Sequence, residues 1–116
     1  MLGCDIIEIE RIEQSILKFG ESFLKHILSE NEIALYNKRG KKAEFAAGRF
    51  AAKEAVSKAL GTGIGIDYRF TDIEILPNEY GKPYVYLKSQ KKENIEISIS
   101  HSRINAVAVC IIKEAE

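Results

Sequence analysis

The fold of this chain is limited above all by the stretch GRFAAKEAVSKALGTGIG at residues 48–65. Small apolar side chains fill most positions between Ala43 and Leu60, which predicts a long helix that packs closely on more than one side. Gly61 follows the last helical residue and suits the left-handed conformation at a helix C-terminus. The same helix carries Glu54 and Lys58, which are one turn apart and share a face.

Two interpretations of Glu54 and Lys58 fit the sequence. In the first they form an exposed ion pair, which stabilises a helix by about 0.2–0.5 kcal/mol. In the second they border a cleft, because the flanking side chains are almost all small and apolar. The glycines that follow do not form a Walker loop, and they lie at the negative end of the helix dipole. We expect them to let the backbone pass close to a ligand or to another subunit.

The rest of the chain predicts helices mainly in the N-terminal half and strands mainly in the C-terminal half. An opening strand precedes apolar residues at helical spacing from Ile9 to Phe19, and SENE at 29–32 is a capping box. Strands are expected near 70–76, 84–87, 95–101 and 106–112, between segments rich in turn formers. The fold class is therefore α+β, with helices packed on an antiparallel sheet, in a single domain that covers residues 1–116.

Composition excludes several classes of protein. The formal net charge is zero and basic residues do not alternate with aromatic ones, so nucleic acid is not an expected partner. No apolar run is long enough to span a bilayer and no leader pattern precedes MLGC, so we expect a cytoplasmic protein without membrane contact. Cys4 and Cys110 have no metal-binding or disulfide companions nearby and are interpreted as reduced thiols.

The charge is nevertheless unevenly distributed. Residues 36–58 contain 7 basic and 2 acidic side chains, including the run KRGKK. Such a segment predicts an anionic ligand or partner nearby, and a solvated loop is the alternative. Arg11, Lys18 and Lys25 recur every seven residues and share one face if the helix continues through Gly20. That face is either simply solvated or docks an acidic partner.

Two further residues are candidates for chemistry. Asp5 interrupts an apolar strand, where a carboxylate needs water, a cation or a hydrogen-bond donor. If Asp5 met Glu54, the pair could hold Mg²⁺, which takes one or two carboxylates together with water and substrate phosphates; the residues alone do not establish that they meet. His101 alternates with the isoleucines of 95–99, which predicts a core histidine. Its place at the strand end also suits a phosphate contact or proton transfer.

Four segments in order, GCDIIEIERI, GRFAAKEAVSKALGTGIG, NEYGKPYV and ISISHSRINAVAVCII, resemble the 4′-phosphopantetheinyl transferases, and among them the small bacterial holo-acyl-carrier-protein synthase type. The resemblance covers nearly the whole chain and implies the fold of that family. It implies a Mg²⁺-dependent enzyme of fatty acid biosynthesis that transfers the phosphopantetheine arm of coenzyme A to a serine of apo acyl carrier protein and releases adenosine 3′,5′-bisphosphate. Family members of this size are trimers with active sites between subunits, so the resemblance also implies a homotrimer.

The resemblance assigns roles to individual positions. Asp5 and Glu54 match the metal ligands, Lys58 matches a lysine near the coenzyme phosphates, and His101 matches a histidine that contacts the coenzyme. Glu54, Lys58 and His101 are the catalytic candidates; the base that takes the serine proton is either Glu54, directly or through a metal-bound water, or His101. Arg11 matches a residue that meets the carrier protein, and Lys18 and Lys25 extend that predicted contact. Further coenzyme contacts are implied at Arg49, Lys53, Gly61, Gly63, Gly65, Asn78, Gly81, Lys82 and Pro83.

A non-catalytic alternative remains from the sequence. An oligomeric module that binds a nucleotide or an acidic protein could carry the same basic segment. Replacing Asp5 or Glu54 with alanine separates the two hypotheses. A binding module keeps most of its affinity, whereas a transferase loses rate by orders of magnitude.

Overall fold

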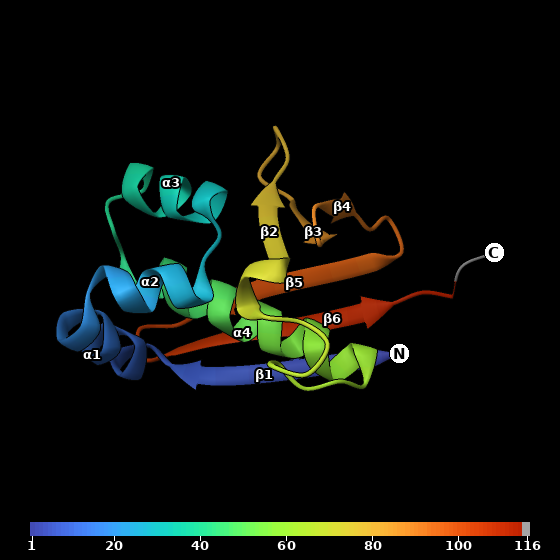
Figure 1. Cartoon of the computed structure of the whole chain (residues 1–116), viewed down its shortest axis with the longest axis horizontal. Helices are drawn as coiled ribbons and strands as arrows, with labels where there is room; N and C mark the ends of the chain where they lie inside the picture. The colour runs from blue at the N-terminus through green and yellow to red at the C-terminus, as the bar shows by residue number, and fades with distance from the viewer. Residues whose placement is uncertain (115–116) are drawn as a thin grey trace.

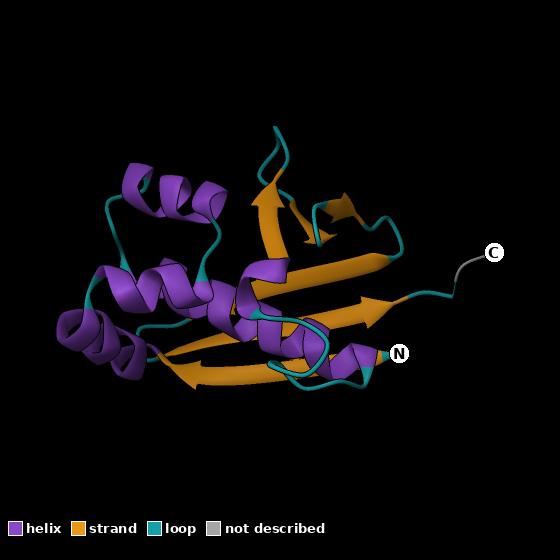
Figure 2. Ribbon diagram, in the orientation of Figure 1, coloured by secondary structure: helices purple, strands orange, loops and turns teal. Residues whose placement is uncertain are grey.

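The computed structural model describes residues 1–114, and its helices and strands separate along the chain as the sequence predicts (Figure 1). One strand is followed by four α-helices, and a short 3₁₀ turn then leads into five strands (Figure 2). The elements are β1 (Leu2–Glu8), α1 (Ile9–Phe19), α2 (Glu21–Ile27), α3 (Glu30–Lys38), α4 (Ala43–Leu60), η1 (Phe70–Asp72), β2 (Ile73–Pro77), β3 (Pro83–Leu87), β4 (Gln90–Lys91), β5 (Ile95–His101) and β6 (Asn105–Ile112).

The strands form two antiparallel sheets, with orders β1-β6-β5 and β2-β3-β4. The predicted α+β class is confirmed, although the expected single sheet is divided in two. Strand β6 pairs with both of its neighbours, so that Asp5 on β1 faces Ala108 and His101 on β5 faces Ala106. Because β1 lies near the start of the described chain and β6 near its end, the first sheet forms only when these distant segments pair.

Helix α4 lies across the first sheet and forms the centre of the core (Figure 1). Its alanines from Ala46 to Ala59 are almost completely buried, as are the inward-facing residues of β6. The close approach is clearest at Gly3 on β1, where an added Cβ would lie 1.9 Å from the carbonyl oxygen of Ala55. Small residues on α4 therefore let the strand backbone and the helix backbone touch.

Local signals for helix ends are confirmed. Ser29 accepts a hydrogen bond from the backbone N–H of Glu32, and the Glu32 carboxylate accepts one from the backbone N–H of Ser29, which completes the capping box of α3. Gly61 ends α4 in the left-handed conformation, with φ of 78°. Gly20 has φ of 58° and ψ of −134° and separates α1 from α2, so the helix does not continue through it.

The strand expected from residue 70 begins three residues later, at Ile73. The Asp72 side chain accepts a hydrogen bond from the backbone N–H of Arg69, which stabilises the turn of η1 in place of extended backbone. The SQKKEN segment is mainly a turn, as expected, but it includes the two-residue strand β4.

The outward face of the first sheet carries exposed apolar side chains. Leu2 is 69% exposed and pairs across the ladder with Ile111, which is 45% exposed. Ile6 and Val109 extend the same face, with Cys4 between them. This patch, Leu2, Cys4, Ile6, Val109 and Ile111, is called the outer sheet face below. Within residues 1–114, no helix combines the length and the apolar character needed to cross a membrane.

Candidate active site

Strand β1 and helix α4 bring Asp5, Glu54 and Lys58 together. The ammonium of Lys58 donates to the Asp5 carboxylate at 2.9 Å and to the Cys4 carbonyl at 3.0 Å. The ion pair that Lys58 makes is thus with a strand 53 residues away rather than with Glu54 on its own helix. The interpretation of Glu54 and Lys58 as a simple helical ion pair is wrong, because β1 packs against this part of α4 and offers a fixed carboxylate.

Glu54 lies in an environment that disfavours its charge. Partial burial raises the pKa of its carboxyl, and the negative charge of Asp5 raises it further, while Lys58 acts in the opposite direction. Lys58, one helical turn from Glu54, is held at the Asp5 carboxylate, so Asp5 and Glu54 lie on neighbouring parts of β1 and α4. Two like charges at such a place are stabilised by a cation or by proton uptake.

The chemistry of this pair fits a magnesium ion. Carboxylate oxygens are the ligands that Mg²⁺ prefers, and it commonly takes only one or two of them from a protein. Within residues 1–114 no group of three or more histidine, cysteine, aspartate or glutamate side chains is placed to hold a metal. A Mg²⁺ ion held by Asp5 and Glu54 would take its remaining ligands from water and substrate phosphates, as it commonly does in proteins.

Glu54 also lines a cavity of about 660 Å³ between α2, α4 and η1. This volume lies within the usual range for ligand sites, about 300–1,000 Å³. The cavity contains three phenylalanines, and the Phe50 and Phe70 rings stack with centroids 5.1 Å apart. It is called the Glu54 cavity; besides Glu54 its lining includes Phe23, Lys25, His26, Phe50 and Phe70, together with Ile27, Ile64, Gly65, Arg69 and Thr71.

His101 lies in a second cavity, of about 650 Å³, between the start of α4, β5 and the β2–β3 hairpin. The side chain of His101 is 49% exposed and its Nδ1 lies 3.5 Å from the Glu44 carboxylate. The expected core histidine is wrong, because burial decreases along β5 and ends before His101. The lining of this His101 cavity combines four basic side chains with apolar and small ones; it consists of Arg39, Lys42, Glu44, Phe45, Gly48, Arg49, Pro77, Gly81, Pro83, Ile97, Ser98, Ile99 and His101.

Arg49 gives the His101 cavity a buried positive charge. The residue is only 7% exposed, its Nε donates to the Ile75 carbonyl at 3.2 Å, and its guanidinium lies 4.4 Å from the Phe45 ring centroid. Burial lowers the pKa of Arg49 to about 10, so the side chain stays charged at neutral pH. Arg39 contacts the same ring at 5.3 Å. Two guanidinium groups around one ring favour an anionic ligand in this cavity.

Lys53 lines neither cavity. It is completely buried, and its ammonium donates to the Ile27 carbonyl, to the Glu32 carboxylate and to the Phe70 carbonyl, at 2.6, 2.6 and 3.0 Å. All three of its donors are therefore used inside the protein. This geometry argues against the expected coenzyme contact at Lys53.

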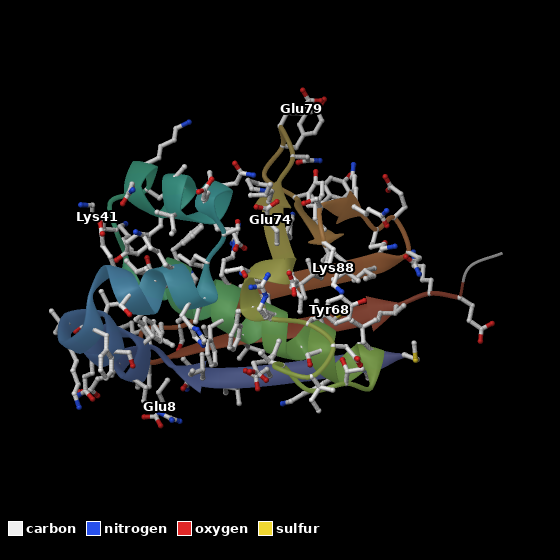
Figure 3. The ribbon with its side chains drawn as sticks, viewed as in Figure 1. Glu8, Lys41, Tyr68, Glu74, Glu79 and Lys88 are labelled. Atoms are coloured by element: carbon white, nitrogen blue, oxygen red, sulfur yellow. The ribbon has the colours of Figure 1, made fainter. Side chains whose placement is uncertain are left out.

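The predicted loop residues divide between the two cavities. Gly81 and Pro83 line the His101 cavity, and Gly65 lines the Glu54 cavity. The Asn78 side chain accepts hydrogen bonds from the backbone N–H groups of Tyr80 and Lys82, so it shapes the hairpin whose exposed tip carries Glu79 (Figure 3). Lys82 lies over the Tyr84 ring at 5.7 Å, and Gly61 and Gly63 line neither cavity.

The basic row predicted on one helix face is interrupted. Arg11 and Lys18 are exposed on α1, whereas Lys25 is exposed on α2, beyond the break at Gly20. Of the three, Lys25 lines the Glu54 cavity.

Sequence analysis missed Glu44, His26 and Phe70 as lining residues. Their positions relative to α4 depend on long-range packing, and no local spacing indicates them.

Within one chain the predicted catalytic residues do not all meet. The two cavities share no lining residue. Asp5 and His101 lie on strands separated by β6, which places them about 10 Å or more apart. The chain therefore carries two separate clusters of candidate residues, one with carboxylates and Lys58 and one rich in basic side chains; they are called the two half-sites below.

The fold and these half-sites define a small α+β protein with a carboxylate pair at one site and a cation-lined cavity for an anion at another. The sequence model of the 4′-phosphopantetheinyl transferase superfamily matches residues 1–112. The chain belongs to this superfamily.

Similar proteins carry a more specific name. A holo-[acyl-carrier-protein] synthase of Fusobacterium nucleatum is 50% identical over 96% of each chain. The crystal structure of the Helicobacter pylori holo-[acyl-carrier-protein] synthase in complex with coenzyme A has a TM-score of 0.86 and 37% identity, over 97% of this chain and 100% of that one. A Bacillus anthracis holo-(acyl-carrier-protein) synthase in complex with CoA (3′,5′-ADP) has a TM-score of 0.85 and 42% identity, over 98% and 96%.

Proposed function

We propose that this protein transfers the 4′-phosphopantetheine group of coenzyme A to a serine of apo acyl carrier protein. The observation that carries the proposal is the meeting of Asp5, Glu54 and Lys58 in a chain that matches the transferase superfamily over residues 1–112. The similar proteins from F. nucleatum and H. pylori are holo-[acyl-carrier-protein] synthases, and the second binds coenzyme A.

In the proposed reaction the serine Oγ attacks the phosphorus that carries the pantetheine arm. A bond forms between Oγ and phosphorus, and the bond from phosphorus to the bridging pyrophosphate oxygen breaks. Adenosine 3′,5′-bisphosphate leaves with that oxygen, and the serine proton passes to a base. Lys58 supplies positive charge beside the carboxylates, where it stabilises negative charge on the phosphates.

Glu54 is the proposed base. In the metal-free protein, burial and the charge of Asp5 raise the pKa of its carboxyl. It lines an open cavity that an acceptor serine could enter. His101 is the second candidate, since its imidazole is accessible in the other cavity.

Asp5 and Glu54 are the residues that would hold Mg²⁺. When bound, the ion neutralises pyrophosphate charge and acts as a Lewis acid on it. In the absence of the ion, Lys58 balances Asp5, while Glu54 is held partly buried without an ion-pair partner among the described residues.

The His101 cavity is the proposed site for the nucleotide end of coenzyme A. Arg49 and Arg39 flank Phe45, and Lys42 and His101 add further basic groups. Gly81 and Pro83 of the hairpin form the opposite wall. Phosphate groups match guanidinium donors well, which supports this assignment.

We further propose a homotrimer with active sites between subunits. Two observations support it. The half-sites of one chain are separate, so a neighbouring copy must contribute one of them if a single coenzyme spans both. The outer sheet face is apolar and exposed, with Leu2 and Ile6 69% and 62% exposed, and such patches mark interaction surfaces.

The proposed carrier-docking residues are Arg11, Lys18 and Lys25, all exposed and basic.

The proposed setting is fatty acid biosynthesis in the cytoplasm. The free thiols of Cys4 and Cys110 are consistent with a reducing compartment.

The test is mass spectrometry of purified apo acyl carrier protein incubated with this protein, coenzyme A and Mg²⁺. We expect the carrier to gain the mass of one phosphopantetheine group, and EDTA to abolish the gain. An unmodified carrier, shown to be competent with another transferase, would reject the proposal in favour of the non-catalytic binding module.

The variants Asp5→Ala and Glu54→Ala distinguish the two functions further. We expect each to lower the transfer rate by about 100-fold or more. Coenzyme binding, measured by calorimetry without metal, should change little. Full activity in both variants would remove Asp5 and Glu54 from the mechanism.

A further inference from the structure

Lys53 and Glu32 form an ion pair that is completely buried and that connects several segments of the chain. Both side chains are completely inaccessible to solvent, and their charged atoms lie 2.6 Å apart. Glu32 also accepts from the backbone N–H groups of Ser29, at 2.9 Å, and Ile75, at 3.0 Å. Together with the two carbonyl contacts of Lys53, these bonds leave neither charged group without partners.

The groups that the pair bonds belong to the segments that surround the Glu54 cavity. Lys53 precedes Glu54 on α4, and its two carbonyl acceptors are those of Ile27, the last residue of α2, and Phe70, the first residue of η1. Ile27 and Phe70 both line the Glu54 cavity. A single ammonium therefore joins the three segments that form the cavity walls.

The second half of the pair anchors these walls to the rest of the molecule. Glu32 lies in the first turn of α3, and its bond to Ile75 attaches that turn to β2. Glu74, the neighbour of Ile75 on β2, accepts from Ser29 and Asn31 and strengthens the same junction (Figure 3). Phe70 of η1 also stacks on Phe50 of α4 and makes an edge contact with His26 of α2. The position of η1 therefore fixes the side chains that line the cavity.

We propose that Lys53 and Glu32 are positioning residues, which hold α2 and η1 at a fixed distance from α4 and so set the width of the Glu54 cavity. This inference rests on the proposed transfer reaction. It differs from the expected role of Lys53, because Lys53 acts on the walls of the site and not on the coenzyme. Misplacing a reacting group by about 1 Å costs on the order of 100-fold in rate, so a small change in width has a large effect on turnover.

Stability and positioning can be separated experimentally. Removing one member of a buried ion pair leaves an uncompensated charge and is strongly destabilising, whereas replacing both with apolar residues of similar volume is often neutral or stabilising. The informative variant is therefore the double substitution Glu32→Met with Lys53→Met. The matched control is Lys91→Met with Glu93→Gln, which removes an exposed ion pair outside both cavities.

The experiment measures Tm, kcat and the KM for coenzyme A of the wild-type protein and both double variants. For the core double variant we expect a Tm close to wild type, a kcat lowered at least about tenfold, and a KM for coenzyme A within about twofold, because the walls move while the His101 cavity keeps its cations. The control should match wild type in all three. A core double variant with wild-type Tm and wild-type kcat overturns the inference, since the pair is then only structural.

A second variant covers the case in which the core double variant does not fold. Glu32→Asp keeps the charge that Lys53 needs but shortens the side chain, so it weakens the bonds to Ser29 and Ile75 and shifts the anchor of Lys53. We expect lower kcat with retained cooperative unfolding, and faster amide hydrogen exchange at Ser29 and Ile75; unchanged kcat contradicts the inference.

Transfer by the wild-type protein is measured in the same assay. Its absence rejects the proposed function, whereas normal wild-type transfer with normal variants rejects only the positioning role.

Discussion

The environment of Glu54 changes the pKa of a carboxyl group that has a role in the proposed reaction. Burial and the charge of Asp5 raise the pKa of its carboxyl, so the ionised form is less favourable in the folded protein than in the unfolded chain. Its protonated form contributes stability that is present below the ordinary glutamate pKa and is lost as pH rises through the raised pKa. At neutral pH the folded protein therefore carries an unfavourable charge at a functional position.

We predict that Glu54→Gln stabilises the metal-free protein at pH 7 and lowers transfer by about 100-fold or more, because the amide carries no charge and cannot accept the serine proton. Below about pH 4 the stabilisation should disappear, since the wild-type carboxyl is then protonated in both states. Thermal unfolding at both pH values, without Mg²⁺, measures the first effect.

Glu96→Gln is the control for this prediction. A hydrogen bond from Lys113 lowers the pKa of the Glu96 carboxyl, which is the opposite direction. This variant should not gain stability at neutral pH. If Glu54→Gln lowers Tm at pH 7, the environment described for Glu54 is incorrect.

Between elements, the contact of β1 with α4 decides whether the Asp5 carboxylate reaches Lys58. We predict that Gly3→Ala destabilises the protein by about 3 kcal/mol or more, because the added Cβ would overlap the Ala55 carbonyl oxygen and force the strand away from the helix. Tm should fall by about 10 °C or more. Denaturant unfolding followed by circular dichroism measures the change.

Gly48→Ala is the matched comparison on α4. Its added Cβ would lie 3.1 Å from a side-chain methyl of Ile99 rather than against backbone, and alanine is the better helix former. We expect a stability change within about 1 kcal/mol. A Gly3→Ala variant as stable as this one would show that β1 and α4 are not closely packed.

At the scale of the whole molecule, the separation of the half-sites and the apolar outer sheet face make a prediction about assembly. Val109→Glu places a charge at the centre of that face and should convert the proposed trimer to monomers with most of the transfer activity lost. Light scattering after size-exclusion chromatography gives the mass. Ala34→Glu, at an exposed position on α3, should leave both properties unchanged. Monomeric wild-type protein with full activity contradicts the shared-site proposal.

The distribution of charge predicts how the carrier protein is recruited. Raising salt from about 0.1 M to about 1 M shortens the Debye length from about 10 Å to about 3 Å and weakens attraction between exposed charges. The KM for apo acyl carrier protein should therefore rise severalfold with salt, and Arg11→Ala should reduce that dependence. Initial rates at several carrier concentrations measure it. A KM independent of salt in the wild-type protein argues against electrostatic docking.

The local features were predictable because they depend on neighbours in the sequence. The alanine-rich run of α4, the Ser29–Glu32 capping box and the left-handed Gly61 are each specified within a few residues. The alternation of Ile95 and Ile97 likewise predicts one buried face of β5. The order of these elements was sufficient to predict the α+β class.

The site depended on which distant elements meet. The residues alone indicate that Asp5 lies on a strand, Glu54 and Lys58 on a helix and His101 at a strand end. The pairing of Lys58 with Asp5, the exposure of His101 and the burial of Lys53 against Glu32 follow only from the three-dimensional arrangement. The physical reason is that burial and charge pairing are set by contacts between segments far apart along the chain, which no local pattern encodes.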